Sequence, residues 1–356
     1  MGSLPTPPAD ASAYPTGHSA RVAARANAIL STSGLAPDYL QANLIVLPSR
    51  YAADFRLLCK RNPVPCPLLA ESASVGSYSA LKSWMDGVAD DAVAKGIDIR
   101  TDAPRYMVYN NGTLTASHIA DVSAHWDASD HVAFLIGCSY SFEAALARQG
   151  LTPRHTQLNR VVPMYRTRLP LSPAGVFTGA THVVSMRPYP RRAVAAVRAA
   201  TRPFVAAHGE PVAWGWDAAR ELLRDGADVN APDWGEPPVM ADGVSPLVEG
   251  DEENVPVFWG CGVTPQEAVV RAGLEGTVLG HAPGHMIVLD VRDEDVFGKV
   301  VVEGRDVMLL LIDWGKQRDA EGKGFEKEIV GLENINFSHL CVRDESGLDA
   351  SGPCLA

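Results

Sequence analysis

The sequence predicts an α/β protein, in which a mainly parallel sheet domain carries helices on both faces and a second, smaller α+β domain is attached. Short apolar runs alternate along the chain with segments of helical length, which is typical of α/β folds. Some of these runs are continuous, such as 'HVAFLIG' at 131–137, as expected for strands that are buried on both faces. A chain of 356 residues can form one or two such domains.

The first part of the chain begins with residues 1–17, which are rich in Pro, Ala and Ser and are predicted to form a disordered tail. A helix is then expected from Ser19, its N-cap, to Gly34, where it stops. The Asn-Gly pair in 'RYMVYNNGTLT' predicts a tight hairpin. The other elements expected here are a strand at 43–48, a helix at 51–62, a Pro-rich connector and a strand at 131–137.

The second part shows the same alternation. The elements expected are strands at 161–167 and 181–188, helices at 191–209 and 216–226, an acidic loop at 227–254, and the strand, helix and strand of 'VPVFWG', 'TPQEAVVRAG' and 'GHMIVLDV'. The predicted division is a main α/β domain at 18–150 and 235–298, a smaller α+β domain at 151–234, and a C-terminal extension at 299–356.

Composition narrows the classes of function. A formal net charge of −11 argues against a nucleic-acid or anionic-membrane partner, while a local pocket can still bind a small anionic substrate. No run approaches the roughly 20 apolar residues of a transmembrane helix. Six cysteines without CxxC spacing predict reduced thiols and a cytoplasmic location. A mitochondrial location stays open, although no clear transit peptide is seen, and so does a homo-oligomer.

Two stretches resemble each other, 'FLIGCSYSFEAAL' at 134–146 and 'FWGCGVTPQEAVV' at 258–270. Each is an apolar run that ends in Gly-Cys, followed by a hydroxyl residue and a helical pattern. Thr264 is expected to cap the second helix, with Glu267 completing a capping box, and Ser141 holds the equivalent position in the first.

Such turns present free backbone N–H groups and bind anions. Two of them facing one crevice could hold both ends of a dicarboxylate, with Gly262 in the second turn. Cys138 and Cys261 would then have a lowered pKa. The alternative interpretation is that both cysteines are small buried packing residues.

Further polar residues are candidates for the same site. His281 and His285 are four residues apart and could act as acid and base, but the Pro-Gly pair between them argues against a helical metal site, so no metal or cofactor is predicted. Arg166 and Arg187 follow strand-like runs and could bind a carboxylate or form ion pairs. Glu143 could be a general base or merely favour the helix dipole.

Taken in order, many segments resemble the D-glutamate cyclase family, whose bacterial members are described as putative hydro-lyases. The matching pieces cover roughly 17–298 and are 'QANLIVLP', 'NPVPCPLL', 'DIRTDAPRY', 'FLIGCSYSFEAAL', 'VVPMYRT', 'PAGVFTG', 'VVSMRP', 'PVFWGCGVTPQ' and 'HAPGHMIVLD'. The resemblance implies a two-domain α/β protein that dehydrates D-glutamate to 5-oxo-D-proline. Leu289 departs from the hydroxyl residue expected before the aspartate of the last block, and the stretch after about 300 has no counterpart.

The leading hypothesis is therefore a hydro-lyase that acts on a small carboxylate-bearing substrate, with D-glutamate as the first candidate. The catalytic residues expected are Glu143, His281, His285 and Cys261. The substrate-binding residues expected are Arg166, Arg187, Cys138, Ser141, Gly262, Thr264 and Asp290. The alternatives are a thiol-dependent amidohydrolase, a non-catalytic protein that binds an anionic metabolite, and a lyase of a specialised metabolite.

Overall fold

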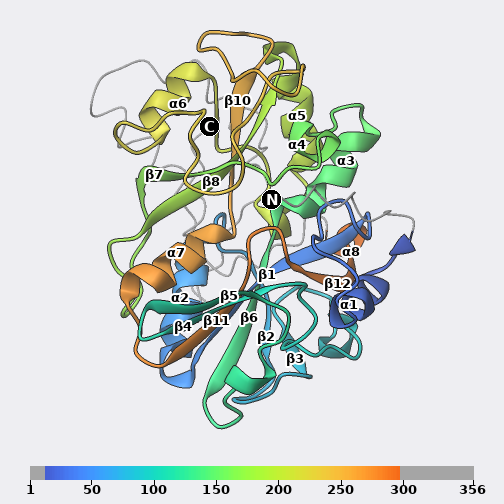
Figure 1. Cartoon of the computed structure of the whole chain (residues 1–356), viewed down its shortest axis with the longest axis vertical. Helices are drawn as coiled ribbons and strands as arrows, with labels where there is room; N and C mark the ends of the chain where they lie inside the picture. Colours follow the sequence, from blue (N-terminus) through green and yellow to red (C-terminus); the bar gives the residue numbers. More distant parts are fainter. Residues whose placement is uncertain (1–12, 297–356) are drawn as a thin grey trace, which may run out of the picture. The chain divides into compact units, whose positions relative to one another are not determined.

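The computed structural model describes residues 13–296, and these build two antiparallel β-sheets (Figure 1). The predicted tail up to residue 12 and the C-terminal extension from 299 lie outside the described residues. The larger sheet has the order β3-β2-β6-β1-β11-β4-β5, and β12 also pairs with β1. Its strands are β1 (Tyr39–Pro48), β2 (Leu68–Ser72), β3 (Leu81–Ser83), β4 (Tyr106–Asn110), β5 (Thr113–Ile119), β6 (His131–Gly137), β11 (Thr277–His281) and β12 (Ile287–Arg292).

The smaller sheet has the order β7-β8-β10-β9. Its strands are β7 (Met164–Pro170), β8 (Thr181–Tyr189), β9 (Ala213–Trp214) and β10 (Val255–Gly260). The α-helices are α1 (Gly17–Arg25), α2 (Ala52–Arg61), α3 (Glu143–Arg148), α4 (Arg154–Gln157), α5 (Val194–Thr201), α6 (Trp216–Leu222), α7 (Val263–Ala272) and α8 (Asp293–Val296). Short 3₁₀ turns include η5 (Ser139–Phe142) and η7 (Val205–Ala207).

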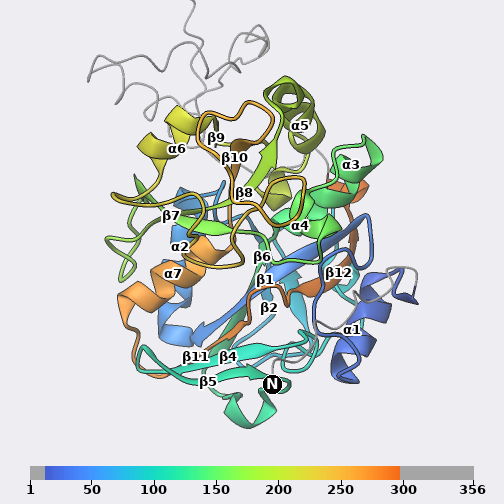
Figure 2. The same cartoon turned by 45° about the horizontal axis from the view of Figure 1, so that its top comes forward.

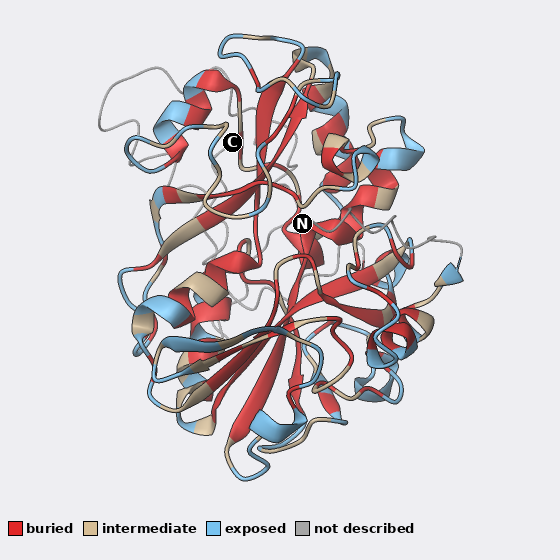
Figure 3. Ribbon diagram, in the orientation of Figure 1, coloured by how far each residue is buried: buried red, intermediate tan, exposed pale blue. Residues whose placement is uncertain are grey.

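The predicted mainly parallel sheet is wrong, because the strand pairs of both sheets are antiparallel. The error came from the continuous apolar runs. Along β1, Leu44 and Val46 face one apolar cluster while Ile45 and Leu47 face another. A strand covered on both faces reads as a continuous apolar run whether its neighbours are parallel or antiparallel. Burial, and not strand direction, produced the pattern (Figure 3).

The prediction of helices on both faces of the large sheet also fails. Helices α2 and α7 lie side by side over one face, to which they contribute Phe55, Leu58 and Val269 (Figures 1 and 2). The other face is covered largely by connecting segments, including Val93 and Ile99. An apolar sheet face has to be shielded from water, and connecting segments do this on one face as helices do on the other.

Local signals were read more successfully. The Asn-Gly hairpin is present between β4 and β5, with Asn111 and Gly112 both at positive φ, as such a turn requires. The first helix was predicted less well, since it ends at Arg25 and not at Gly34. It also begins earlier than expected, because Thr16 is the N-cap and Ser19 completes a capping box from inside the helix. None of the described helices is long and apolar enough to cross a membrane.

The chain crosses between the two sheets at both Gly-Cys turns. Strand β6 belongs to the larger sheet, yet Phe142 and Leu146 after it pack with Trp259 of the smaller sheet. Strand β10 belongs to the smaller sheet, yet Val269 in the following α7 packs on the larger sheet. All described residues belong to one compact unit, so the two turns are crossings in opposite directions at the junction of its two sheets.

Candidate active site

The structure brings the two Gly-Cys corners together. Cys138 and Cys261 belong to one buried apolar cluster with Met286 and the partly buried Trp234. A common crevice therefore remains consistent with the fold, although the sheets are antiparallel. We call residues 137–141 the first corner and residues 260–264 the second corner.

Close packing explains the glycines at these corners. A Cβ on Gly137 would lie 1.8 Å from the carbonyl oxygen of Ala206, and one on Gly262 would lie 1.9 Å from Nδ2 of Asn43. Neither glycine has a positive φ, so the close contacts, and not a left-handed backbone conformation, require glycine here. Ala206, in the segment after α5, therefore packs against the first corner, and the side chain of Asn43 in β1 packs against the second.

The predicted N-caps are wrong. Helix α7 begins at Val263 with Gly262 as its N-cap, and no side chain caps it. Thr264 instead accepts a hydrogen bond from the backbone N–H of Val183 in β8 (2.9 Å). In the first corner Ser141 accepts one from the N–H of Gln41 in β1 (2.9 Å). Both hydroxyl residues thus tie a corner to a neighbouring strand, which satisfies a buried backbone donor.

The corner thiols are poorly suited to nucleophilic chemistry, contrary to the expectation of a lowered pKa. Both cysteines are 7% exposed. Burial raises the pKa of Cys138 to about 12 and that of Cys261 to about 11. In an apolar cluster the charged thiolate loses more solvation than any helix end returns, so the packing interpretation of these cysteines gains support.

Beside the first corner lies a buried ion-pair network. The guanidinium of Arg187, which is fully buried, donates to Oε1 of Glu143 from Nε (3.0 Å) and from a terminal nitrogen (2.5 Å). The same guanidinium donates to the hydroxyl groups of Ser139 and Ser185. His155 lies 3.0 Å from Glu143. These contacts hold the corner to β8 and leave little capacity for a ligand.

Glu143 is ionised in this network. Burial by itself would raise the pKa of the carboxyl group, but the charges of His155 and Arg187 prevail and lower it to about 2. A carboxylate with so low a pKa is a weak base. Glu143 and Arg187 therefore form a structural ion pair, in which each buried charge is balanced by the other.

Asn43 connects the first corner with His281. Its Nδ2 donates to the carbonyl oxygen of Gly137 (2.9 Å), and its Oδ1 lies 3.0 Å from Nε2 of His281. The other ring nitrogen of His281 lies 2.7 Å from the carbonyl oxygen of Ala282. Protonation would complete both hydrogen bonds, but burial prevails and lowers the pKa of His281 to about 4.

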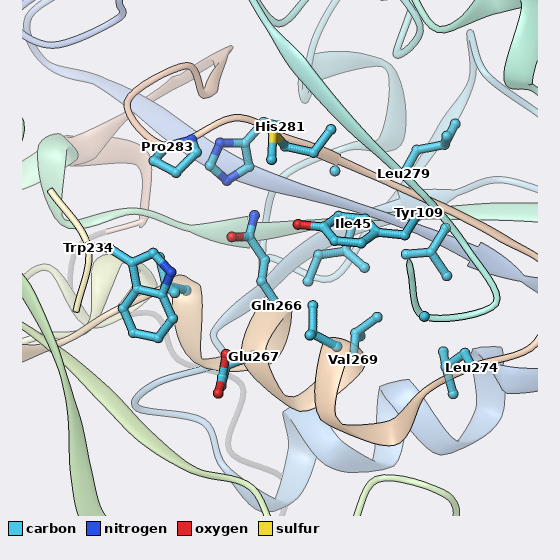
Figure 4. A pocket seen from close by; sticks show the side chains of 16 residues that line it. Ile45, Tyr109, Trp234, Gln266, Glu267, Val269, Leu274, Leu279, His281 and Pro283 are labelled. Carbon is cyan, nitrogen blue, oxygen red and sulfur yellow. The ribbon is translucent and has the colours of Figure 1, made fainter. Parts of the chain in front are cut away.

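A cavity of about 150 Å³ lies beside the second corner, between helix α7 and strands β4 and β11 (Figure 4). Its wall is mainly apolar, with Ile45 and Val269 on opposite elements. The polar side chains in the wall are those of Tyr109, Trp234, Gln266, Glu267 and His281. A mostly apolar cleft with a few convergent polar groups is the form that small-molecule sites usually take.

Arg166 lies close to Trp234 and Glu267 of this wall. Its guanidinium donates to both carboxylate oxygens of Glu267 (2.8 and 3.2 Å) and to Asp233 (3.0 Å), and it stacks over the indole of Trp234 at 4.2 Å. Its side chain remains 39% exposed. Of the two roles predicted for Arg166, its contacts in the structure are those of an ion pair. These contacts hold Trp234 and Glu267 of the pocket wall in place.

Two other predicted residues lie in different surroundings. Asp290 in β12 accepts hydrogen bonds from Arg21 and from the backbone of Lys95, which fasten helix α1 and a connecting segment to the large sheet. His285 has Nδ1 at 2.7 Å from the carbonyl oxygen of Pro283 and its ring against His118. Within the described residues no group of three or more metal-ligating side chains comes together.

The residues of the site missed from the sequence include Asn43, Gln266 and His208. Asn43 stands inside an otherwise apolar strand pattern, and this polar interruption was a usable signal, whereas Gln266 precedes Glu267 in a mixed helix pattern. His208 is 3% exposed, adopts φ of 82°, and places its ring against Gly260. No sequence pattern predicts a histidine in the left-handed region, which is several-fold more common for Asn, Asp and His than for other residues but still rare.

Comparisons with known proteins agree with one another. The model of the D-glutamate cyclase family matches residues 132–290, which contain both corners and most of the pocket wall. A protein of Schizosaccharomyces pombe described as "Putative hydro-lyase C5H10.01" is 44% identical over 73% of this chain and 79% of its own. A "Putative hydro-lyase" of Stutzerimonas stutzeri is 45% identical over 74% of this chain and 89% of its own.

Among solved structures, a nitrogen repressor-like protein from Methanococcus jannaschii aligns over 79% of this chain and 97% of its own, with a TM-score of 0.32 and 10% identity. So low a score carries no argument about fold or function. The Schizosaccharomyces pombe and Stutzerimonas stutzeri proteins do support an argument about the fold, because chains that are more than 40% identical over most of their length share one fold. This chain is therefore a member of the D-glutamate cyclase family.

Proposed function

We propose that this protein is a hydro-lyase acting on a small carboxylate-bearing substrate, with D-glutamate as the first candidate and 5-oxo-D-proline and water as the products. The observation that carries the proposal is the pocket at the second corner. It lies within the stretch matched by the family model, apart from Ile45, Met107, Tyr109 and Gly112 from the neighbouring strands. Its size and its few polar groups suit a small molecule.

The proton balance of this reaction suits the polar groups present. The ammonium nitrogen of the substrate forms a bond to the γ-carbonyl carbon, and one γ-oxygen leaves. The nitrogen loses two of its three protons, and the leaving oxygen needs two protons to depart as water. No net acid or base is consumed, so the protein has only to move protons over a short distance. No cofactor is required by this balance.

His281 is the residue we assign to proton movement. It lines the pocket, and both of its ring nitrogens lie beside oxygen acceptors. Because burial lowers its pKa to about 4, the ring is neutral near pH 7, so it can pass a proton from the substrate nitrogen to the leaving oxygen but does not hold that proton. Arg166 would orient the α-carboxylate from the side of Trp234, through the guanidinium N–H groups that Glu267 and Asp233 leave open.

The rival thiol amidohydrolase receives no support from the site, since both corner thiols have a raised pKa. A protein that only binds an anionic metabolite, and a lyase of a specialised metabolite, remain outcomes of the test.

The test is proton NMR of the purified full-length protein with a panel of acidic amino acids and hydroxy acids. Formation of 5-oxoproline from D-glutamate, lost in His281→Gln and kept in a control substitution of the exposed His118, would support the proposal. Dehydration of another acid would keep the hydro-lyase and replace the substrate. Saturable binding without turnover anywhere in the panel would overturn the proposal in favour of a binding protein.

A further inference from the structure

The side-chain amide of Gln266 lies in the wall of the pocket, and its nitrogen donates no hydrogen bond to a described residue. Its Nε2 is buried from solvent and has no hydrogen-bond partner among the described residues. Figure 4 shows the amide extending from α7 between Trp234 and Tyr109 toward the side of His281. A buried amide donor without a protein partner is unfavourable by itself, and beside a cavity a ligand can supply the missing acceptor.

The charge of the pocket wall narrows the kind of ligand. The described wall contains one acidic residue, Glu267, and one histidine, His281, and Arg166 pairs with Glu267 through two hydrogen bonds. His281 is held neutral by burial. The remainder of the described wall is apolar or amide, so it offers an incoming γ-carboxylate no unpaired cation, and Arg166, which is not itself part of the wall, is assigned to the α-carboxylate. Burying a carboxylate there without a partner would be strongly unfavourable.

Resting on the proposed function, we propose that the pocket binds the reacting end of the substrate in its uncharged form, as a neutral carboxyl group or lactam carbonyl, and that the Gln266 amide is the donor that recognises this oxygen. No described residue holds the amide nitrogen in a hydrogen bond, so the amide can turn toward such a ligand.

An uncharged pocket favours the chemistry as well as the binding. A carboxylate is a poor electrophile, and desolvation stabilises the neutral acid relative to the anion. The same desolvation favours the free amine over the ammonium ion. Transfer of one proton from nitrogen to the γ-carboxylate gives both neutral partners with no change in total charge. The second proton follows when the N–C bond forms and water leaves, and the lactam that remains has the neutral carbonyl that Gln266 would bind.

The proposal is tested by equilibrium binding, which does not depend on turnover. Isothermal titration of the full-length protein would use 5-oxo-D-proline, the carboxylate-free lactam 2-pyrrolidone, and the open-chain dicarboxylate glutarate. We expect both lactams to bind at the pocket, and 5-oxo-D-proline at least about tenfold more tightly than glutarate. Gln266→Leu should weaken lactam binding by about tenfold, the value of one hydrogen bond of 1.4 kcal/mol.

The controls separate recognition from folding. Gln149→Leu, at an exposed glutamine after α3, should leave lactam binding unchanged. Since Nε2 of Gln266 has no partner to lose, Gln266→Leu should keep the melting temperature of the wild type. Gln266→Met provides a second apolar variant that should behave in the same way.

The two proposals can fail separately. Lactam binding that depends on Gln266, without turnover of D-glutamate, would discard the proposed substrate and keep the pocket assignment. Turnover of D-glutamate with lactam affinity unchanged in Gln266→Leu would overturn the pocket assignment and keep the proposed function. Glutarate binding as tightly as the lactams, or no lactam binding by the wild type, would also overturn it.

Discussion

The two Gly-Cys corners have similar sequences and different surroundings. At the first corner the neighbouring polar groups are already hydrogen-bonded within the protein, because Glu143 accepts hydrogen bonds from Arg187 and Thr156 and lies against His155. At the second corner the amide nitrogen of Gln266 has no partner in the described part of the chain and lies beside a cavity. The comparison teaches that a repeated strand–turn–helix pattern marks where the chain crosses between sheets, and that the satisfaction of nearby polar groups separates the structural crossing from the candidate site.

The largest effect is expected at the first corner. Glu143→Gln keeps the shape of the side chain but leaves the buried Arg187 without its counter-charge, which should lower the free energy of unfolding by about 3–5 kcal/mol. Urea unfolding measures this loss, and the exposed Glu275→Gln serves as the control. A loss under about 1 kcal/mol would show that the network does not hold the corner.

Next come the close contacts that require glycine. In Gly137→Ala the new methyl group meets a backbone oxygen, whereas in Gly262→Ala it meets the side chain of Asn43. We expect Gly137→Ala to reach about 3 kcal/mol, the upper part of the usual range for overpacking, and Gly262→Ala to lose less because a side chain can move. Equal losses in urea unfolding would contradict this ranking.

Acid should destabilise the protein through His281, whose pKa is lowered to about 4. The unfolded chain binds this proton below about pH 6.5, so the stabilisation is complete above that value and is lost as the pH falls toward 4. Between pH 7 and pH 5 the contribution of this one residue is about 2 kcal/mol. His281→Gln should remove that part of the pH dependence, and an unchanged pH profile would contradict the prediction.

The smallest effect is expected for the thiols. Cys261→Ala leaves only a small cavity and should lower the free energy of unfolding by about 1 kcal/mol, with turnover retained. In the native protein at pH 8, iodoacetamide should modify Cys138 and Cys261 slowly, while urea-unfolded protein reacts fully. Loss of turnover in Cys261→Ala with normal stability would revive the thiol mechanism.

The sequence was sufficient for much of the local structure. The Asn111-Gly112 hairpin, the helices near 51–62 and 216–226, and the two corners were all predicted from turn and periodicity signals. The direction of strand pairing was not, because an apolar run such as 'HVAFLIG' records burial and not the direction of its neighbours. Long-range pairing has no local signature, and this is why the parallel sheet was predicted wrongly.

The candidate site was also predicted only in part, because contacts between distant segments have no local signature in the sequence. The sequence singled out Cys138 and Cys261 directly after predicted strands, Glu143 in the helix after the first strand, and His281 in the Pro-Gly segment before the last one. It could not show that burial raises the pKa of the thiols, or that Arg187 and Glu143 face each other across 44 positions of sequence. Gln266 was passed over because a glutamine in a helix is ordinarily a surface residue, and its role depends on a pocket built by strands far along the chain.

The most direct test of the difference between the corners is to locate a bound lactam. A crystal structure of the protein with 5-oxo-D-proline would show which corner holds it. We predict the lactam ring in the cavity between α7 and β11, with its carbonyl oxygen within hydrogen-bonding distance of the Gln266 amide. A ligand found instead at Arg187 beside the first corner, with Gln266 still unpartnered, would contradict the assignment of the second corner as the candidate site.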